Sequence, residues 1–429
     1  MDAIGKEKRC PIMQQTPPKK VTIWNKTFIC CVLANMFLYT SQAIVNPLVT
    51  TYAAYIGASA SIVGMISGFY FGVSFAMKPA SGPMVSLLDK KKLMIFTYAV
   101  GVVANLGYAA SQTVGLFIAS RALHGVQFSL LGALTLTVAS DSLPKEKLGS
   151  GLGIFGLSGI FGNAFGPSLG LMLQAWGDKV FGAGGGFRLT FLIAAAITLL
   201  SIIPCLVMDA PPKPDRKTMA ALGPWYKNIV NLDALPSAIM MAFYCMSAGL
   251  YNTFLVPYAA QYGIEGIGLF FTVNAIASLV SRPISGQLLD KKGIAFVFYP
   301  CTVLSIFALL LVGLVHALPA VLVAGAITGI SWGTLSPAMQ SMSMQVVTPA
   351  KRGVASNTSY LGMDLGFFLG PTLAGLVVAH TDSYGTMFVS AIIPYIIGVI
   401  VFALSWKHYK TRVAAVQREM ASTEQVKNE

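Results

Sequence analysis

The chain has 429 residues, of which 55% are hydrophobic and only 10% are charged, and its mean hydropathy is +0.69. Soluble domains carry about 25% charged residues, so this composition excludes an ordinary soluble protein and indicates a polytopic membrane protein. The formal net charge of +13 does not indicate nucleic acid as a partner, because the Lys and Arg residues gather in the tails and in the loops of one side.

Twelve segments are apolar and long enough to cross a bilayer as helices, which takes about 20 residues each. Helices are expected because lipid offers no partner to a free backbone group. We therefore predict an all-α integral membrane protein with twelve transmembrane helices. In chain order, the predicted spans are 27–52, 60–85, 93–111, 114–139, 150–175, 188–208, 234–261, 266–288, 294–316, 319–345, 354–380 and 384–406.

The basic residues predict how these spans are oriented. Lys and Arg are frequent in both tails and in the loops that hold Lys90–Lys92, Lys291–Lys292 and Lys351–Arg352, and all of these lie on the same side of the predicted spans. Only Lys179 and Arg188 fall in a loop on the other side. Because cytoplasmic loops are enriched in Lys and Arg, we expect a multi-pass protein of the plasma (inner) membrane with both termini in the cytoplasm.

The two halves of the chain repeat each other at an offset of 204 residues. KPASG at 78–82 recurs as RPISG at 282–286, and GNAFGP at 162–167 recurs as GFFLGP at 366–371. Repeats of this kind describe many secondary transporters, in which the substrate binds between the halves near the midplane. We expect two pseudo-symmetric six-helix bundles. The predicted division is a cytoplasmic N-tail at 1–26, a bundle at 27–208, a cytoplasmic linker at 209–233, a second bundle at 234–407 and a cytoplasmic C-tail at 408–429.

Three motifs resemble those of the major facilitator superfamily. RPISGQLLDKKG (282–293) resembles the loop signature that follows the second helix of a half, and LFIASRALHG (116–125) resembles the fourth-helix motif. GIFGLSGIFGNAFGPSLG (153–170) resembles the fifth-helix motif typical of twelve-helix drug:proton antiporters. The resemblance covers the whole chain. It implies the major facilitator fold and export driven by proton entry through alternating access, and it places Arg121 at the family's conserved arginine.

The resemblance also implies which residues control the conformational change. In the loop signatures these are Gly82, Ser86, Arg282, Gly286 and Asp290, and in the fifth helix they are Gly153, Gly162, Gly166, Pro167 and Gly170. Ser86 stands where the family has an aspartate that helps to hold one conformer, so the usual balance between conformers is in question here. Small residues four apart let helices approach closely and proline bends a helix. We therefore expect the fifth helix to form a tight, bendable seal between the halves.

Two short patterns that are typical of enzymes lack the structural context that enzymes require. GLGIFG (151–156) matches a nucleotide-binding pattern but follows no strand. GPSLG (166–170) matches a nucleophile elbow but lies inside a predicted helix. The sequence contains no HExxH and no P-loop GK[ST]. We expect no enzyme activity, no cofactor and no metal site.

Four predicted helices carry polar side chains at a spacing that places them on one face. Because such a face is costly against lipid, it should meet water or protein, and in the family these four helices line the cavity. We expect a substrate cavity here, with polar contacts between helices as the alternative. The cavity residues are Asn35, Tyr39, Gln42 and Asn46 in the first helix, Gln127 in the fourth, Tyr244, Tyr251 and Asn252 in the seventh, and Trp332, Ser336 and Gln340 in the tenth.

One acid and one base are predicted deep inside helices, and both break the repeat. They are Asp364 and Arg121, whose counterparts in the other half are Ile160 and Gly325. A charge at the bilayer centre costs roughly 2.5–3.5 kcal/mol, and a carboxylate that is neutral in one conformer and ionised in another is a proton carrier. We expect Asp364, Arg121 and His124 to couple protons to transport. In the alternatives, Asp364 locks two helices together or touches the substrate, and Arg121 and His124 contact a substrate anion.

These features predict a secondary active transporter that exports a small organic compound, a drug or a metabolite, with protons as the coupling ion. Its partners would be the compound, protons and the lipid bilayer, with no nucleic acid, and it would act as a monomer. A metabolite importer or uniporter of the same fold is the first alternative, favoured by Ser86 and by the lack of an acid in the first helix. A non-transporting membrane sensor or binding protein is the second alternative. The Asn, Gln and Tyr residues on the polar faces predict a neutral or anionic substrate.

Overall fold

The computed structural model describes residues 23–144, 148–209, 229–348 and 351–428. Within these ranges the regular structure is helical and contains no strand. Eleven helical segments of the described chain are long and apolar enough to cross a membrane, and α11 (Gly268–Lys292) adds a shorter apolar segment, Gly268–Arg282. The predicted all-α membrane fold is confirmed.

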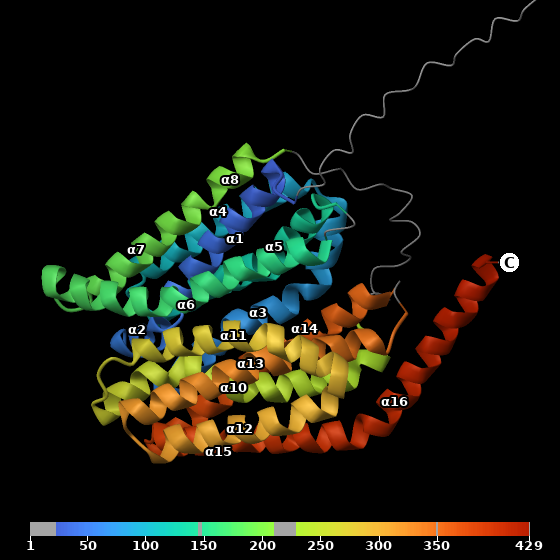
Figure 1. Cartoon of the computed structure of the whole chain (residues 1–429). Helices are drawn as coiled ribbons and strands as arrows, with labels where there is room; N and C mark the ends of the chain where they lie inside the picture. The colour runs from blue at the N-terminus through green and yellow to red at the C-terminus, as the bar shows by residue number, and fades with distance from the viewer. Residues whose placement is uncertain (1–22, 145–147, 210–228, 349–350, 429) are drawn as a thin grey trace, which may run out of the picture.

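The helices follow the chain in two groups. The first group consists of α1 (Lys26–Val45), α2 (Leu48–Tyr55), α3 (Ala60–Leu87), α4 (Lys90–Ala110), α5 (Val114–Asp141), α6 (Leu148–Phe181), α7 (Gly185–Leu200) and α8 (Ile202–Val207). The second group consists of η3 (Leu232–Ala234), α10 (Leu235–Tyr262), α11, α12 (Ile294–Leu314), α13 (Leu318–Gln345), α14 (Arg352–Thr381), α15 (Tyr384–Ser390) and α16 (Ile392–Asn428). Figure 1 shows each group as a separate bundle.

Local sequence sets the ends of several helices. Asn25 is the N-cap of α1, because its side chain accepts a hydrogen bond from the Phe28 N–H at 2.8 Å. Asp89, which follows the first-half loop signature, caps α4 by accepting from the Lys92 N–H at 3.1 Å. The motif residues Gly82, Ser86, Gly153, Gly286 and Asp290 lie within helices, but the surroundings of their side chains are outside the described part of the structure.

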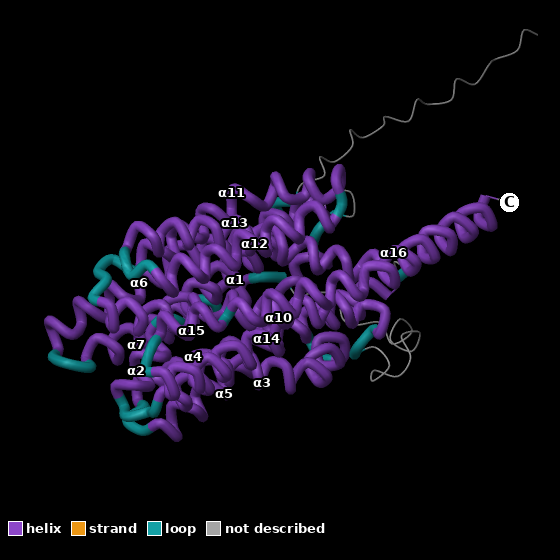
Figure 2. The backbone as a smooth tube through the Cα atoms, turned by 90° about the horizontal axis from the view of Figure 1, so that it is seen from below, coloured by secondary structure: helices purple, strands orange, loops and turns teal. Residues whose placement is uncertain are grey.

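Both bundles begin and end on the same side of the molecule. The starts of α1 and α10 and the ends of α8 and α16 lie at the right in Figure 1; we call this the tail side and the opposite side the far side. Helix α16 continues past residue 407 to Asn428 and projects beyond the bundle (Figure 2). Residues 408–428, predicted as a tail, are therefore helical.

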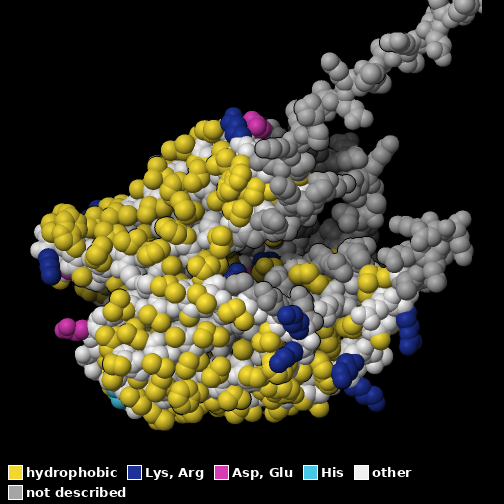
Figure 3. Space-filling view, in the orientation of Figure 1, with side chains coloured by type: hydrophobic (Ala, Val, Ile, Leu, Met, Phe, Trp, Pro, Cys, Tyr) yellow, Lys and Arg dark blue, Asp and Glu magenta, His cyan; other side chains and the backbone are white. Residues whose placement is uncertain are grey.

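The halves are joined most closely on the far side. The Thr50 hydroxyl donates to the Thr253 carbonyl at 2.9 Å, and a Cβ added to Gly64 of α3 would lie 2.8 Å from the Cα of Gly375 in α14. On the tail side the bundles diverge (Figure 1), and Figure 3 shows a hollow between them in which Lys or Arg side chains are visible. The structure is closed on the far side and open on the tail side.

Three fifth-helix glycines, Gly162, Gly166 and Gly170, pack on α1 inside the first half. A Cβ added to Gly162 would lie 2.7 Å from the backbone carbonyl carbon of Tyr39, and one added to Gly170 would lie 3.1 Å from that of Ile44. The contact of α6 with the other half includes instead Ser168, which donates to the Gly268 carbonyl of α11 at 2.9 Å, and the Ala164 carbonyl, which accepts from Thr272 at 3.3 Å. The expectation that these glycines seal the two halves is wrong, because their face of α6 is already occupied by α1.

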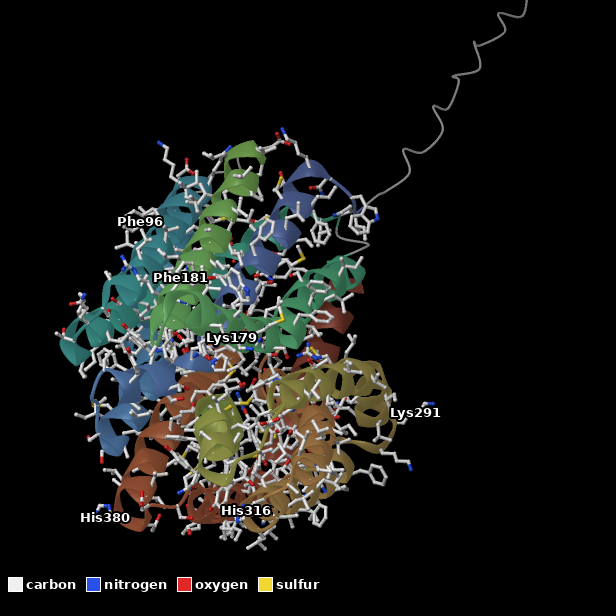
Figure 4. The ribbon with its side chains drawn as sticks, turned by 90° about the vertical axis from the view of Figure 1, so that its left-hand side faces the viewer. Phe96, Lys179, Phe181, Lys291, His316 and His380 are labelled. Atoms are coloured by element: carbon white, nitrogen blue, oxygen red, sulfur yellow. The ribbon has the colours of Figure 1, made fainter. Side chains whose placement is uncertain are left out.

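The outer surface of both bundles is largely apolar, as a lipid-facing surface requires (Figure 3). Figure 4 looks onto the far side, where Lys179 and Phe181 lie on the first half and His316 and His380 on the second. The His316 ring stacks on Tyr262, with ring centroids 3.7 Å apart. The exposed Lys and Arg residues of the described far side are Lys179 and Arg188.

Candidate functional site

Asp364 lies at the boundary between the two halves. Its side chain is 0% exposed. The Ser74 hydroxyl donates to its Oδ2 at 2.9 Å, and the Lys78 Nζ lies 3.6 Å from the same oxygen, with the Lys78 side chain 14% exposed. Asp364 belongs to α14, whereas Ser74 and Lys78 belong to α3. The buried acid is therefore one partner of an ion pair that joins the bundles.

Helix α3 brings Lys78 to Asp364 because glycines let it lie directly against α14. A Cβ on Gly68 would overlap the carbonyl group of Phe368, and a Cβ on Gly72 would lie 2.8 Å from the Phe368 ring. Ser74 and Lys78 are four residues apart on α3, so their side chains lie on one face of the helix, and both reach the Oδ2 atom of Asp364. Close packing of the two backbones thus positions the charges.

Sequence reasoning missed Lys78 as the partner of Asp364. A signal was present, because Lys78 is the base of KPASG and its repeat counterpart is Arg282 of RPISG. A base inside an apolar helix needs a counter-ion, and Asp364 is the acid predicted deep in a helix. What the sequence did not supply was the neighbour relation between α3 and α14.

Arg121 is buried inside the first half and is separate from the ion pair. Its Nε and Nη2 atoms donate to the backbone carbonyls of Ile66 and Ser67, both at 3.4 Å. Its guanidinium carbon lies 4.7 Å from the centroid of the Tyr70 ring, a distance at which a cation–π interaction is favourable. Two backbone carbonyls and one aromatic ring of α3 therefore stabilise the Arg121 guanidinium in place of a carboxylate.

His124 and Gln127 follow Arg121 along α5 and are also buried polar residues. The Nδ1 atom of His124 shares a hydrogen bond with the Tyr108 hydroxyl at 3.1 Å, and the Tyr70 ring lies 5.0 Å from the His124 ring. Nε2 of His124 and both amide atoms of Gln127 are buried without a hydrogen-bond partner among the described residues. The three predicted coupling residues therefore lie in two separate places. Asp364 lies between the halves, and Arg121 and His124 lie inside the first half.

The predicted polar face of the first helix is divided in the structure. Asn35 donates to the Ser158 hydroxyl of α6 at 2.7 Å, and Gln42 is also buried inside the first half. Tyr39 and Asn46 are only half-buried. Asn46 ends α1 directly before Pro47, whose missing N–H interrupts the helix. The Tyr39 ring lies 3.3 Å from a Cβ added to Gly159 of α6.

In the second half, the predicted cavity residues lie in and around a row of aromatic rings. Tyr244 stacks on Trp332, with centroids 5.9 Å apart and planes 12° apart, and Trp332 lies 5.8 Å from Phe367. Phe367 stacks at 4.7 Å on Phe71 of the first half. The row thus crosses the boundary between the halves within one helical turn of Asp364.

Other predicted cavity residues lie outside this row. Tyr251 is buried and stacks on Phe270, while Asn252 is exposed. Ser336 is half-buried, and Gln340 donates to the Ser356 hydroxyl at 3.2 Å. Gln340 also lines an open cavity of about 350 Å³ along the tail-side part of α13, with Pro337, Ser341, Met344 and Gln345. Gln340 is therefore placed at the opening on the tail side.

The fold and the site define a class of protein. Two repeated six-helix bundles, closed on one side, open on the other and joined by a charged contact, have the architecture of secondary transporters. The sequence matches the Major Facilitator Superfamily over residues 31–232 and 237–427. The chain belongs to this superfamily and is a multi-pass membrane transporter of small molecules, not an enzyme.

Relatives of the chain include exporters. It is 22% identical over 358 residues to the staphylopine export protein of Staphylococcus aureus, and the aligned region covers 81% of this chain and 88% of the relative. It is 25% identical over 384 residues to the multidrug resistance protein MdtG of Yersinia enterocolitica, covering 84% and 88%. The MdtG of Escherichia coli K12 is 23% identical over 407 residues, covering 91% and 96%.

Solved structures of transporters share the fold. A bacterial homologue of the human lysosomal transporter Spinster, in an inward-facing and unoccupied conformation, superimposes with a TM-score of 0.73 at 13% identity, covering 91% of this chain and 97% of that one. The nucleoside transporter NupG superimposes with a TM-score of 0.69 at 14% identity, covering 87% and 99%.

Proposed function

We propose that the chain is a proton-coupled exporter of a small organic compound, acting as a monomer by alternating access in the plasma (inner) membrane. The observation that carries the proposal is the ion pair of Lys78 and Asp364. It joins the two halves that must move against each other, and it contains a carboxylate fully shielded from solvent. The exporters among the relatives support the outward direction.

We place the tail side in the cytoplasm. Lys90, Lys91 and Lys92 lie at the tail-side end of α4, and Lys291 and Lys292 lie at that of α11. Lys and Arg favour the cytoplasmic side of a membrane protein, which supports this orientation. The open side then faces the cytoplasm, so the conformation corresponds to the inward-facing state of the cycle.

The pair couples protons to this cycle through the distance between its charges. In the inward-facing state the positive charge of Lys78 stabilises the ionised carboxylate of Asp364. Opening the far side moves α3 against α14 and separates the pair, and a buried carboxylate without a cation favours a proton. Asp364 then takes up a proton from outside, and the return of Lys78 releases it to the cytoplasm. The compound drives the opposite movement by its different affinity for the two states.

The first test is Asp364→Asn in proteoliposomes with an imposed pH gradient. Proton flux is recorded with an internal pH dye while a panel of drugs and metabolites is added. We expect compound-dependent proton flux with the wild type, opposite in direction to the compound, and its loss in the variant while the compound still binds. Asp382→Asn is the matched control, because Asp382 ends the same helix and is exposed on the far side.

A metabolite importer or uniporter is the second candidate. It is favoured by the composition of α1, which contains no acid, and by the engagement of Asp364 with Lys78, through which the acid would act as a lock. Exchange that does not depend on the pH gradient and that is unchanged in Asp364→Asn would support this candidate. The same result would contradict proton-coupled export.

A further inference from the structure

Two helices of the second half, α12 and α16, are joined by aromatic side chains. Phe298 and Tyr299 of α12 contact the Phe402 ring of α16, with ring centroids 4.3 and 5.4 Å apart. The Phe402 ring also lies 5.1 Å from that of Trp406, one turn further along α16. Helix α12 runs away from the tail side and α16 runs toward it (Figure 1). Residues before Phe298 and residues after Phe402 therefore lie at the same end of the bundle.

Two rings lie beyond this contact toward the tail side, at about the same depth. Phe296 is three residues before Tyr299 on α12, and Trp406 is four residues after Phe402 on α16. At a rise of about 1.5 Å per residue, Phe296 stands about 5 Å and Trp406 about 6 Å beyond the contact that joins the helices. Phe296 is exposed and Trp406 is half-buried. Trp is enriched where a membrane meets water, so this depth corresponds to the headgroup region of the bilayer.

A lysine ammonium group lies over each of these two rings. The Lys292 Nζ is 4.4 Å from the centroid of the Phe296 ring, and the Lys410 Nζ is 4.9 Å from that of Trp406. Both lysines are exposed, and neither takes part in the ion pairs of the described residues. A ring face attracts an ammonium group but leaves it N–H donors for another partner. Packed helices lie about 8–10 Å apart, so the two cations flank one place on the outer surface.

From this place a stripe of exposed apolar side chains runs along α12 toward the far side. Its members follow one another at spacings of three and four residues, which places them on one face of the helix. They are Phe296, Tyr299, Val303 and Phe307. Figure 3 shows the outer surface of the second half as largely apolar, with Lys and Arg side chains at its tail-side end. An apolar stripe that ends at two cations matches the acyl chain and phosphate of a phospholipid.

We propose that Lys292 and Lys410 bind the phosphate of an anionic phospholipid in the tail-side leaflet, while the neighbouring rings of α12 and α16 contact its acyl chains. Ammonium groups form charge-assisted hydrogen bonds with phosphate, and basic pockets between membrane helices bind anionic headgroups. A soluble phosphate compound would leave the exposed rings uncovered, whereas acyl chains cover them. The site lies on the outside of the second half, away from the ion pair between the halves, and does not depend on the direction or coupling of transport.

The test measures lipid binding to the purified full-length protein in detergent by native mass spectrometry. Phosphatidylglycerol and phosphatidylcholine are added separately at the same concentrations, and glycerol 3-phosphate supplies a headgroup phosphate without acyl chains. We expect the wild type to bind phosphatidylglycerol more tightly than phosphatidylcholine and not to retain glycerol 3-phosphate. The increase in melting temperature that each compound produces is the second readout, because a ligand that binds the folded state stabilises it.

Two double variants remove the same charge from the same parts of the chain. Lys292→Gln/Lys410→Gln removes the cations that lie over the rings. Lys291→Gln/Lys407→Gln is the matched control, because these lysines are also exposed and Lys291 points away from the bundle (Figure 4). We expect the first variant to weaken phosphatidylglycerol binding more than tenfold, at about fivefold for each lysine. The control should weaken it much less.

Three results would overturn the lipid site. The first is equal binding of the two lipids by the wild type. The second is equal weakening in the two double variants, which would show that diffuse positive charge attracts the lipid. The third is glycerol 3-phosphate bound as tightly as phosphatidylglycerol, which would show a site for soluble phosphate. If the first double variant melts earlier than the wild type without lipid, the single variants Lys292→Gln and Lys410→Gln replace it, and unchanged binding in both would also overturn the site.

Discussion

Lys78 and Asp364 neutralise each other in a place where neither charge has much water. Lys78→Gln leaves the carboxylate buried with Ser74 as its described partner, and Asp364→Asn leaves the lysine charge without a counter-ion. We expect each single variant to lose about 3–5 kcal/mol of stability and the double variant to lose less, because it contains no unpaired charge. Melting temperatures of the three purified variants in detergent measure this. A double variant as unstable as the sum of the singles would show that the two side chains act independently.

At the scale of single residues, the sequence identified unusual groups but not their partners. Asp364 and Arg121 could be singled out because charges are rare inside apolar helices and because both break the repeat. Their environments differ, since Asp364 meets Lys78 of another bundle whereas Arg121 meets backbone carbonyls and the ring of Tyr70. These contacts depend on which helices are neighbours, which no spacing within one helix reveals.

At the scale of helices, the contact between α3 and α14 depends on glycine. A Cβ on Gly68 would lie 3.1 Å from the carbonyl carbon of Phe368 and still closer to its oxygen, so Gly68→Ala should push the helices apart. We expect a lower melting temperature and slower transport in proteoliposomes. Gly132→Ala in α5 is the matched control, because a Cβ there meets nothing within 4 Å and alanine favours a helix by about 1 kcal/mol. Wild-type behaviour of Gly68→Ala would contradict this account of the contact.

The sequence predicted the helices well because each span must be apolar and must satisfy its own backbone hydrogen bonds. Local interruptions were harder to place. The predicted first span, 27–52, is two helices that meet at Asn46–Pro47. The fifth-helix glycines were correctly expected to permit close packing, but their partner proved to be α1 of the same half. Small residues indicate that some helix approaches closely and do not indicate which one.

At the scale of the whole molecule, alternating access requires the far-side contacts to break during each cycle. Ser168 of α6 and Thr272 of α11 lie on opposite halves with their hydroxyl oxygens 3.3 Å apart. Ser41 and Thr198 form a similar contact at 2.8 Å, but both belong to the first half. The two contacts differ in whether movement of the bundles separates them. Cysteines in their places can therefore distinguish rocking of two rigid halves from movement within a half.

We expect Ser168→Cys/Thr272→Cys to form a disulfide under oxidising conditions, in a protein whose six native cysteines have been replaced by serine or alanine. The side chains face each other closely enough for the bond, which would hold the far side shut and stop transport in proteoliposomes until a reductant is added. Ser41→Cys/Thr198→Cys should form a disulfide and keep transporting, because its bond lies inside one bundle. Continued transport by the oxidised first pair would mean that the far side need not open between α6 and α11, and the rocking of two bundles would have to be abandoned.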